Sequence, residues 1–432
     1  MKYLRQILFE LRHHPLMTWL SIAGTAIAVA LVMTGFMLDR INYAPMAPES
    51  LRDRIVYGHY IDVHFENSGS SSGSMSYDII RRIYDGLPMA ETISYSNSSP
   101  DTSDTSLPGE YPQSQSVRGV DHNFWKIYDF TFEEGAPFTA EESDASLPVA
   151  VITRPIAEKY FGKEEAVGKV IEINGVNYTV RGVIKEPSRL LSTSYAEIYR
   201  TLTPNERQSE DRVAPEMGTL SATILLKPGA DLGELKKWTE SRYATVSEEL
   251  KPEGRSLKYR EQPYDAKEMN TYHGSNSTPD PAPAERMMKI FYTVLLLVPA
   301  INLSSMTRSR LKSRVGEIGV MRAFGCSRTR LFADLLGENL LLSLAGGFIG
   351  LGLSIVFIMT FSNYFFAFGD PWQSTLEQVR ATPDFSMVFS WWNFIAVIGF
   401  CFALNLISAG VPVVKAIFTN PATALSGHNS NK

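Results

Sequence analysis

Four long stretches of the chain carry no Asp, Glu, Lys or Arg: residues 13–38, 290–307, 339–369 and 385–414. A helix needs about 20 mainly apolar residues to cross the hydrocarbon core of a bilayer, which is about 30 Å thick. The stretches therefore predict four transmembrane helices, at residues 16–38, 288–307, 339–362 and 389–414. Pro299 and Asn302 interrupt the second stretch. Buried core helices of a soluble protein are the alternative, but such helices seldom reach this length without a charge.

The N-terminal residues that precede the first stretch repeat apolar side chains at helical spacing, with Leu4, Ile7, Leu8 and Leu11 in one stripe. This pattern predicts an amphipathic helix at residues 1–15 that lies on the cytoplasmic face of the membrane. A frayed start of the first span is the alternative. "AIA" at 26–28 resembles a signal-peptide cleavage site, but the apolar run continues ten residues beyond it, which favours a retained anchor.

The segment between the first two stretches, residues 41–285, alternates helix and strand patterns and predicts an α+β domain. Asn174-Gly175 lies between two alternating strands and predicts a type I′ hairpin within residues 168–186. Ser-rich residues 67–74 predict a flexible loop, and residues 273–285 a Pro-rich linker. Helical patterns cover residues 76–87, 155–162 and 232–246, and further strand patterns cover residues 148–153, 219–227 and 257–263.

Charge is segregated along the chain and predicts its orientation. Residues 39–288 hold 39 acidic and 27 basic side chains, whereas the remainder holds 7 acidic and 14 basic ones. The loop after the second stretch, residues 308–330, contains seven Lys and Arg, and the loop after the third contains only Arg380. Because cytoplasmic loops are rich in Lys and Arg, the 308–330 loop is expected inside, together with both termini. The large domain is then expected outside.

Chemistry-bearing motifs are missing from this sequence. It contains no G-x-x-x-x-G-K-[ST] nucleotide loop, no H-E-x-x-H, no G-x-S-x-G and no Cys/His cluster. Neither cysteine, Cys326 or Cys401, lies in the large domain, so no disulfide is expected there. No acidic or basic residue sits in the middle of a predicted span, where it could form an ion relay. We therefore expect no catalytic, metal or cofactor-binding residue and no nucleic-acid partner.

The basic loop also has an ordered pattern. Ile318, Met321 and Phe324 recur at threes on one helical edge, and Arg314 and Glu317 can pair at i, i+3. Gly325 can end that helix in the left-handed conformation. Ser327 can cap the next helix, which continues into the third span. We therefore predict that residues 308–332 form a rigid cytoplasmic coupling segment that docks a protein. The alternative is a loop whose charges only fix topology.

Small residues recur in the third span at a spacing that is typical of helix–helix contacts in membranes. Gly346 and Gly350 form a G-x-x-x-G pattern, and Gly347 lies beside it. Such residues let membrane helices approach closely, although glycine is also common in membrane helices by chance. We expect these glycines to contact another helix, in this chain or in a second one.

"SRVGEIGVMRAFGCSRTRLFADLLGENLLLSLAGGFIG" at 313–350 resembles the signature of the FtsX-like permease family. Cys326 replaces a usual Ala in this signature, and "NPATAL" at 420–425 resembles the end of such permeases. The positions that match the signature are Arg314, Glu317, Ile318, Gly319, Arg322, Ala323, Gly325 and Ser327. The resemblance assigns these residues, together with Phe324, to ATPase coupling. Residues 333–432 then form the C-terminal permease part. Glu338 and Gly346-Gly347 match its opening.

The external segment is similar to the periplasmic core domain of MacB-like permeases. "GVDHNFWKIYDFTFEEGAPFTAEE" at 119–142 and "PVAVITRPIAEKYFGKEEAVGKVIEINGVNYTVRGVIKE" at 148–186 carry this resemblance. Ala136 stands where the family frequently has Arg. The resemblance covers nearly the whole chain and is specific for the permease class rather than for a cargo.

The resemblance implies four spans in a bacterial inner membrane, both termini in the cytoplasm, and a periplasmic domain of two parts. It implies a second permease copy or paralogue and a separate cytoplasmic ATPase that uses ATP and Mg²⁺. A periplasmic adaptor or an outer-membrane channel are further candidate partners.

Two functions fit these expectations. The first is an ABC transporter permease that exports or extrudes a peptide, drug, lipid or lipoprotein. The second is a transmembrane regulator that passes ATPase motion to a cell-wall hydrolase or a signalling partner without moving cargo. An anchored sensor is a third class, but it would need an output domain inside, and the predicted inside segments are short.

Overall fold

The computed structural model describes residues 15–66, 69–208, 214–271, 278–295, 297, 320–321, 324–367 and parts of 389–406. The chain divides into two compact units, which are described separately. The helical unit comprises residues 1–41, 285–376 and 382–432, and the large domain comprises residues 42–284 and 377–381.

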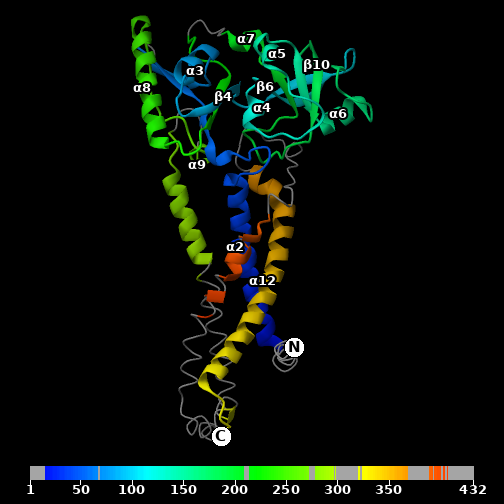
Figure 1. The fold of residues 1–432 in the computed structure, drawn as a ribbon, viewed down its shortest axis with the longest axis vertical. Helices are drawn as coiled ribbons and strands as arrows, with labels where there is room; N and C mark the ends of the chain where they lie inside the picture. The colour runs from blue at the N-terminus through cyan, green and yellow to red at the C-terminus, as the bar shows by residue number, and fades with distance from the viewer. Residues whose placement is uncertain are drawn as a thin grey trace. The chain divides into compact units, whose positions relative to one another are not determined.

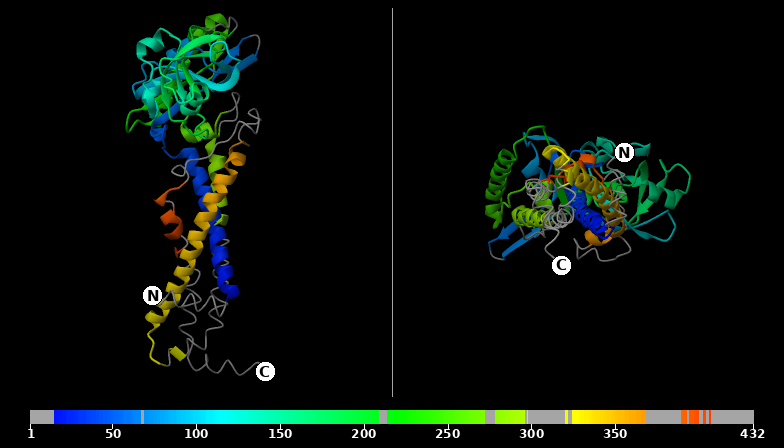
Figure 2. Two further views of the ribbon diagram at one scale, coloured as in Figure 1. Left: turned by 90° about the vertical axis from the view of Figure 1, so that its right-hand side faces the viewer. Right: turned by 90° about the horizontal axis from the view of Figure 1, so that it is seen from below.

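The helical unit contains two long apolar helices, α2 (Pro15–Tyr43) and α12 (Arg328–Ala367), which run side by side in Figures 1 and 2. Within them, Thr18–Ile41 and Leu340–Phe361 are long and apolar enough to cross a membrane. These segments correspond to the first and third predicted spans. The second and fourth predicted spans, 288–307 and 389–414, lie only partly within the described residues, and the amphipathic helix at 1–15 lies outside them except for Pro15.

The large domain is α+β. Its main sheet has ten strands in the order β1-β12-β4-β6-β11-β8-β10-β9-β5, with β7 paired to β10. The strands are β1 (Ile55–Gly58), β4 (Ala90–Asn97), β5 (Asp101–Ser106), β6 (Gln113–Val120), β7 (Phe132–Gly135), β8 (Val149–Thr153), β9 (Val170–Ile173), β10 (Val176–Ile184), β11 (Ile198–Thr201) and β12 (Leu220–Leu226).

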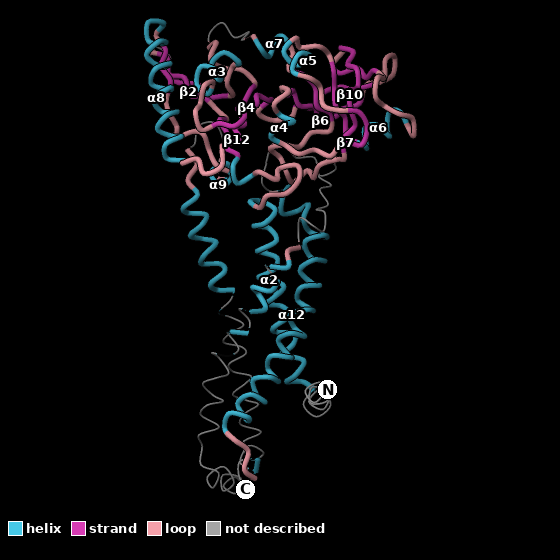
Figure 3. The backbone as a smooth tube through the Cα atoms, in the orientation of Figure 1, coloured by secondary structure: helices cyan, strands magenta, loops and turns pink. Residues whose placement is uncertain are grey.

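Part of this sheet closes on itself; its strands β6 and β10 are drawn in magenta in Figure 3. The strand β5 pairs with β9 and also with the first half of β6, so β6, β11, β8, β10, β9 and β5 form a ring. The second half of β6 pairs with β11. A buried cluster that includes Val117, Ile152, Val180 and Ile198 joins these strands to the helix α6 (Arg154–Phe161).

The other end of the sheet carries a second core. The helices α3 (Tyr77–Tyr84) and α8 (Leu232–Leu250) contact each other, and α3 also packs on β12 (Figure 1). A separate sheet, β13-β2-β3, joins this region, with β2 at Ile61–Phe65, β3 at Gly69–Gly73 and β13 at Arg255–Leu257. The shared core contains Ile79, Ile83, Leu220, Ile224 and Tyr243.

A third, aromatic core lies around the short helix α4 (Phe124–Ile127). The rings of Phe124 and Trp125 each lie within 6 Å, centroid to centroid, of the ring of Tyr199 on β11. Five further short helices lie in the described part of the domain: η1 (Arg52–Arg54), α5 (Ala140–Asp144), α7 (Pro204–Arg207), η2 (Lys251–Glu253) and α9 (Ala266–Asn270).

Most elements predicted in the domain are present. Ser76 caps α3 by accepting a hydrogen bond from the Ile79 N–H at 3.4 Å. Asn174 and Gly175 have φ angles of +48° and +81°, and Val176 pairs with Ile173 across this turn, as a type I′ hairpin requires. The patterns at 148–153, 155–162, 219–227 and 232–246 correspond to β8, α6, β12 and α8.

Three local predictions were wrong. Residues 69–73 of the predicted flexible loop form β3, because β2 supplies a full antiparallel pairing partner that the local sequence cannot reveal. The predicted strand at 257–263 ends at Leu257, after which the Arg260 side chain turns to Asp62 and Glu261 takes a φ of +59°. The predicted linker at 273–285 is helical from residue 281, where Pro281 suits a first helical turn.

Candidate functional site

The described part of the predicted coupling segment is a corner that leads into α12. The Phe324 N–H donates to the Val320 carbonyl and the Cys326 N–H to the Met321 carbonyl, each at 3.0 Å. Gly325 between them has a φ of +85°. A hydrogen bond that spans a left-handed glycine in this way ends a helix in the Schellman arrangement. The corner, residues 320–321 and 324–327, therefore has a defined backbone geometry.

Ser327 begins the next helix. Its hydroxyl accepts a hydrogen bond from the Arg330 N–H at 3.4 Å, and its carbonyl accepts one from the Leu331 N–H at 3.1 Å. A serine at this position satisfies an N–H group that would otherwise lack a partner in the first turn. The helix α12 then continues for 40 residues, or about 60 Å at 1.5 Å per residue. One continuous helix thus connects the corner to the far end of the third predicted span.

Apolar side chains are exposed at the corner. Phe324 is 88% exposed, and Val320 and Met321 are also exposed. A large exposed aromatic side chain beside two aliphatic ones is a common feature of a surface that binds another protein. The remaining predicted coupling residues lie outside the described residues: Arg314, Glu317, Ile318, Gly319, Arg322 and Ala323.

The three glycines of the third span lie at helix contacts within the chain. A Cβ atom at Gly346 would lie 2.7 Å from the Thr25 side chain, and one at Gly350 would lie 2.5 Å from the Ala26 carbonyl oxygen, both on α2. A Cβ atom at Gly347 would meet Ile398 at 2.9 Å. At Gly346 and Gly350 the nearest atoms belong to the α2 backbone or to a Cβ, so only glycine allows the two helices this proximity, whereas the end of the Ile398 side chain could move away from a residue at 347.

Sequence reasoning missed a further contact of α2. A Cβ atom at Gly35 would lie 2.7 Å from the ring of Tyr292, and that ring stacks on Phe36 with centroids 5.1 Å apart. Tyr292 belongs to the helix at residues 281–295. Both residues lie in predicted spans, but no local pattern pairs one span with another, so only the three-dimensional structure identifies the contact.

A buried polar joint anchors the segment that follows α2 inside the large domain. Glu49 is fully buried, and its Oε2 accepts hydrogen bonds from Arg52 while its Oε1 accepts one from the Thr193 hydroxyl at 2.6 Å. The Thr193 carbonyl in turn accepts a hydrogen bond from Arg118 at 3.1 Å. Burial lowers the pKa of the Arg118 guanidinium, which indicates how strongly this site is desolvated. Four side chains therefore connect residues 49–52, strand β6 and the loop before β11.

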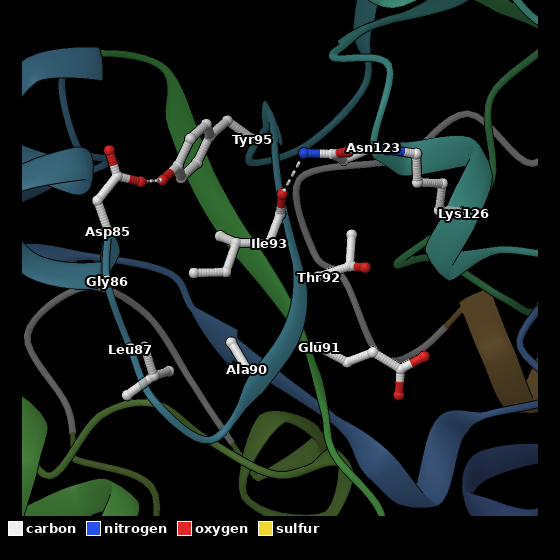
Figure 4. A pocket seen from close by; sticks show the side chains of 10 residues that line it. All are labelled: Asp85, Gly86, Leu87, Ala90, Glu91, Thr92, Ile93, Tyr95, Asn123 and Lys126. Atoms are coloured by element: carbon white, nitrogen blue, oxygen red, sulfur yellow. Dashed lines mark hydrogen bonds between the residues drawn. The ribbon is translucent and has the colours of Figure 1, made fainter.

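A polar hollow of about 380 Å³ lies between the end of α3, the strand β4 and the helix α4, as Figure 4 shows. Its polar groups are largely paired with each other. The Tyr95 hydroxyl donates to Asp85, the Asn123 amide donates to the Ile93 carbonyl at 2.9 Å, and Lys126 donates to Asn123 at 2.9 Å. Burial, followed by the Asp85 carboxylate, raises the pKa of the Tyr95 hydroxyl. Internal pairing leaves few groups for a ligand.

Among the described residues, no group of three His, Cys, Asp or Glu side chains is arranged to hold a metal ion. In the described part of the helical unit, the hollow lined by Val29, Leu340 and Ile398 is too small to hold a water molecule. The described part of the helical unit offers close helix contacts and one exposed apolar corner.

Two protein-family profiles match the chain. The MacB-like periplasmic core domain matches residues 18–241, and the FtsX-like permease C-terminal matches residues 289–421.

The curated proteins that are similar in sequence include one from Bacillus subtilis and one from Escherichia coli. The "Uncharacterized ABC transporter permease YknZ" of Bacillus subtilis is 23% identical over 251 residues, which cover 55% of this chain and 55% of YknZ. The "Macrolide export ATP-binding/permease protein MacB" of Escherichia coli K12 is 24% identical over 250 residues, covering 57% of this chain and 36% of MacB. The chain thus spans about half of the first relative and about a third of the second.

Solved structures of external domains are also similar. The extracellular domain of YknZ from Gram-positive bacteria is 15% identical with a TM-score of 0.33, and covers 46% of this chain and 100% of its own. A domain of a permease protein from Porphyromonas gingivalis is 15% identical with a TM-score of 0.36, covering 48% of this chain and 88% of its own.

Proposed function

Because the chain belongs to the FtsX-like permease family of ABC transporters and carries a MacB-like periplasmic core domain, we propose that it is a permease subunit driven by a separate cytoplasmic ATPase. ATP binding and hydrolysis in the partner move the coupling segment, and the permease relays this motion to its large domain. The result is export or extrusion of a cargo, such as a peptide, drug, lipid or lipoprotein. The chain itself binds no cofactor, and the partner uses ATP and Mg²⁺.

The observation that carries this proposal is the continuity of α12 with the corner. A capped corner with an exposed Phe324 is joined, without a helix break, to a 40-residue helix. A force applied at the corner moves the whole helix, because each turn is hydrogen-bonded to the next. Close contact at Gly346 and Gly350 then passes that displacement to α2.

The proposed location is a bacterial inner membrane, with both termini and the corner in the cytoplasm and the large domain in the periplasm. Seven basic residues in the 308–330 loop support this orientation. A second permease copy or paralogue completes the membrane part, and a periplasmic adaptor or an outer-membrane channel are candidates for further partners.

A regulatory role is the second candidate. The close contacts of Gly346 and Gly350 with α2 would let motion pass from helix to helix by direct contact. Such a chain can act on a cell-wall hydrolase or a signalling partner without moving cargo.

The test is affinity purification of the tagged full-length chain in mild detergent, followed by mass spectrometry. We expect a nucleotide-binding ABC subunit to co-purify from wild-type membranes and to be depleted by Phe324→Ser, which removes the exposed ring. Co-purification of a hydrolase would favour the regulatory role, whereas an outer-membrane channel would favour export. Absence of any ATPase from the wild-type complex would contradict the proposal.

A further inference from the structure

A second hollow, of about 350 Å³, lies over the small sheet β13-β2-β3 of the large domain. Polar side chains line it from all three strands and from the residues after β13: Asp62, His64, Ser70, Ser256, Lys258 and Arg260. None of these residues belongs to the coupling segment or to the helix contacts of the proposed function.

Strand register places these side chains on one face. Ser256 pairs with His64, and His64 pairs with Ser70, so the three stand in one row across the sheet. Since alternate residues of a strand point to opposite faces, Asp62 stands in the next row on the same face. Ile61 and Val63 point the other way and are buried in the core. The hollow therefore belongs to the outer, polar face of the sheet.

The one carboxylate in the hollow is already occupied. Oδ2 of Asp62 accepts two hydrogen bonds from Arg260, at 3.0 and 2.6 Å, and Oδ1 accepts one from the Ser72 hydroxyl at 2.9 Å. Asp62 is buried, and this ion pair forms a fixed part of the hollow. With both oxygens in use, the carboxylate does not serve as a ligand for a cation.

The other polar side chains are available. Within the part of the chain that the structure describes, the side chains of His64, Ser70, Ser256 and Lys258 have no hydrogen-bond or ion-pair partner. Lys258 is a cation and the serines are hydroxyl donors. The hollow of Figure 4 differs, because its Lys126 is paired within the cavity. A surplus of positive charge and of donors over acceptors suits an anion.

We propose that this hollow, the small-sheet hollow, binds a compact oxyanion, a phosphate or carboxylate group, which contacts the Lys258 ammonium and the hydroxyl of Ser256 two residues before it, while His64 and Ser70 complete the lining. The Asp62–Arg260 pair is neutral overall, so Lys258 supplies the net positive charge of the hollow. The ligand group is recognised by charge and by hydrogen bonds rather than by apolar contact.

The test uses hydrogen exchange, read by mass spectrometry, of the full-length chain in dodecyl maltoside, a detergent without phosphate. Sodium phosphate and sodium acetate are titrated separately against sodium chloride at equal ionic strength. We expect slower exchange in peptides that cover residues 61–73 and 255–260. If phosphate alone slows exchange, the hollow binds a phosphate group. If acetate slows exchange as well, the hollow also binds a carboxylate group.

Two variants establish the location. Lys258→Gln should weaken the anion response about tenfold, or about 1.4 kcal/mol, because it removes the charge-assisted hydrogen bond. Lys237→Gln, an exposed lysine on α8, should leave it unchanged. Equal exchange in all three salts, or an anion response that Lys258→Gln does not alter, would overturn the proposal. Neither result depends on the ATPase partner.

Discussion

The Thr193 hydroxyl donates a 2.6 Å hydrogen bond to the carboxylate of Glu49, a fully buried residue 144 positions earlier in the chain. Glu49 follows α2 by only a few residues, and Thr193 lies in the loop before β11. The bond therefore fixes the segment that leaves the first predicted span against the interior of the large domain. In the proposed function, this joint is where motion of α2 enters the domain.

Replacement of Thr193 by valine should loosen the joint. The change leaves Oε1 of the buried Glu49 without its donor, which costs about 1–3 kcal/mol. We expect faster hydrogen exchange in residues 44–54 and 188–197 of the full-length chain, while residues 232–250 exchange as before. The matched control is Thr245→Val on α8, whose hydroxyl donates to the Ser241 carbonyl at an exposed site. Equal effects of the two substitutions would contradict the joint.

The contact between α12 and α2 predicts that one glycine of α12 is needed for stability and that a second glycine of the same helix is not, so the second serves as the control. A Cβ atom at Gly350 would lie 2.5 Å from the Ala26 carbonyl, whereas one at Gly352 would meet nothing within 4 Å. Gly350→Ala should lower stability by about 1–3 kcal/mol through overpacking. Gly352→Ala should not. Thermal unfolding of the detergent-solubilised chain measures the stability of both variants. Equal unfolding temperatures for the two variants would contradict the predicted contact.

The pair Arg200–Glu206 predicts a pH dependence of the large domain. Burial alone would raise the pKa of Glu206, but two hydrogen bonds from Arg200, at 2.7 and 2.9 Å, outweigh it and lower the pKa to about 2. A carboxyl group whose folded pKa lies below its unfolded value of about 4.3 stabilises the fold above that value. This stabilisation is lost as the pH falls from about 4.3 towards 2.

Denaturant unfolding of the full-length chain, followed by tryptophan fluorescence between pH 5 and 3, measures this loss. We expect the unfolding midpoint to fall with pH in the wild type and to fall less steeply in Glu206→Gln. Glu248→Gln, which removes an exposed partner of Lys251, is the control and should keep the wild-type slope. If Glu206→Gln keeps the wild-type slope, Glu206 is not the source of the pH dependence.

The proposed orientation can be tested by cysteine labelling in intact cells. Tyr111 is 95% exposed in the large domain, so Tyr111→Cys should react with a membrane-impermeant maleimide added outside. The native Cys326 in the corner should react only after the membrane is permeabilised. Labelling of Cys326 in intact cells, with Tyr111→Cys protected, would invert the topology and with it the proposed function.

Local patterns predicted those elements whose structure is set locally. Ser76 at the start of α3, Asn174-Gly175 in the hairpin and Gly325 in the corner each adopt the conformation that their residue type favours. The strand β5, "DTSDTS", shows why other elements were missed. Its polar side chains give no alternating pattern, and its pairing with β6 and β9, which closes the ring, depends on strands distant in the sequence.

The functional features also differ in whether a local pattern can predict them. The basic loop and its glycine corner predict a coupling segment from sequence alone. The joint at Glu49, the stack of Tyr292 on Phe36 and the small-sheet hollow all combine residues from separate parts of the chain. Since each partner has an ordinary local context, only the folded structure brings these sites into view.

The most direct test of the central claim, that motion at the cytoplasmic corner reaches the large domain, is hydrogen exchange of the permease–ATPase complex with ATP and with ADP. We expect ATP to change exchange in residues 44–54 and 188–197 of the wild type. Phe324→Ser should abolish this change, whereas Tyr111→Ser, an equally exposed aromatic in the large domain, should preserve it. Identical exchange in ATP and ADP throughout the large domain of the wild-type complex would contradict the account.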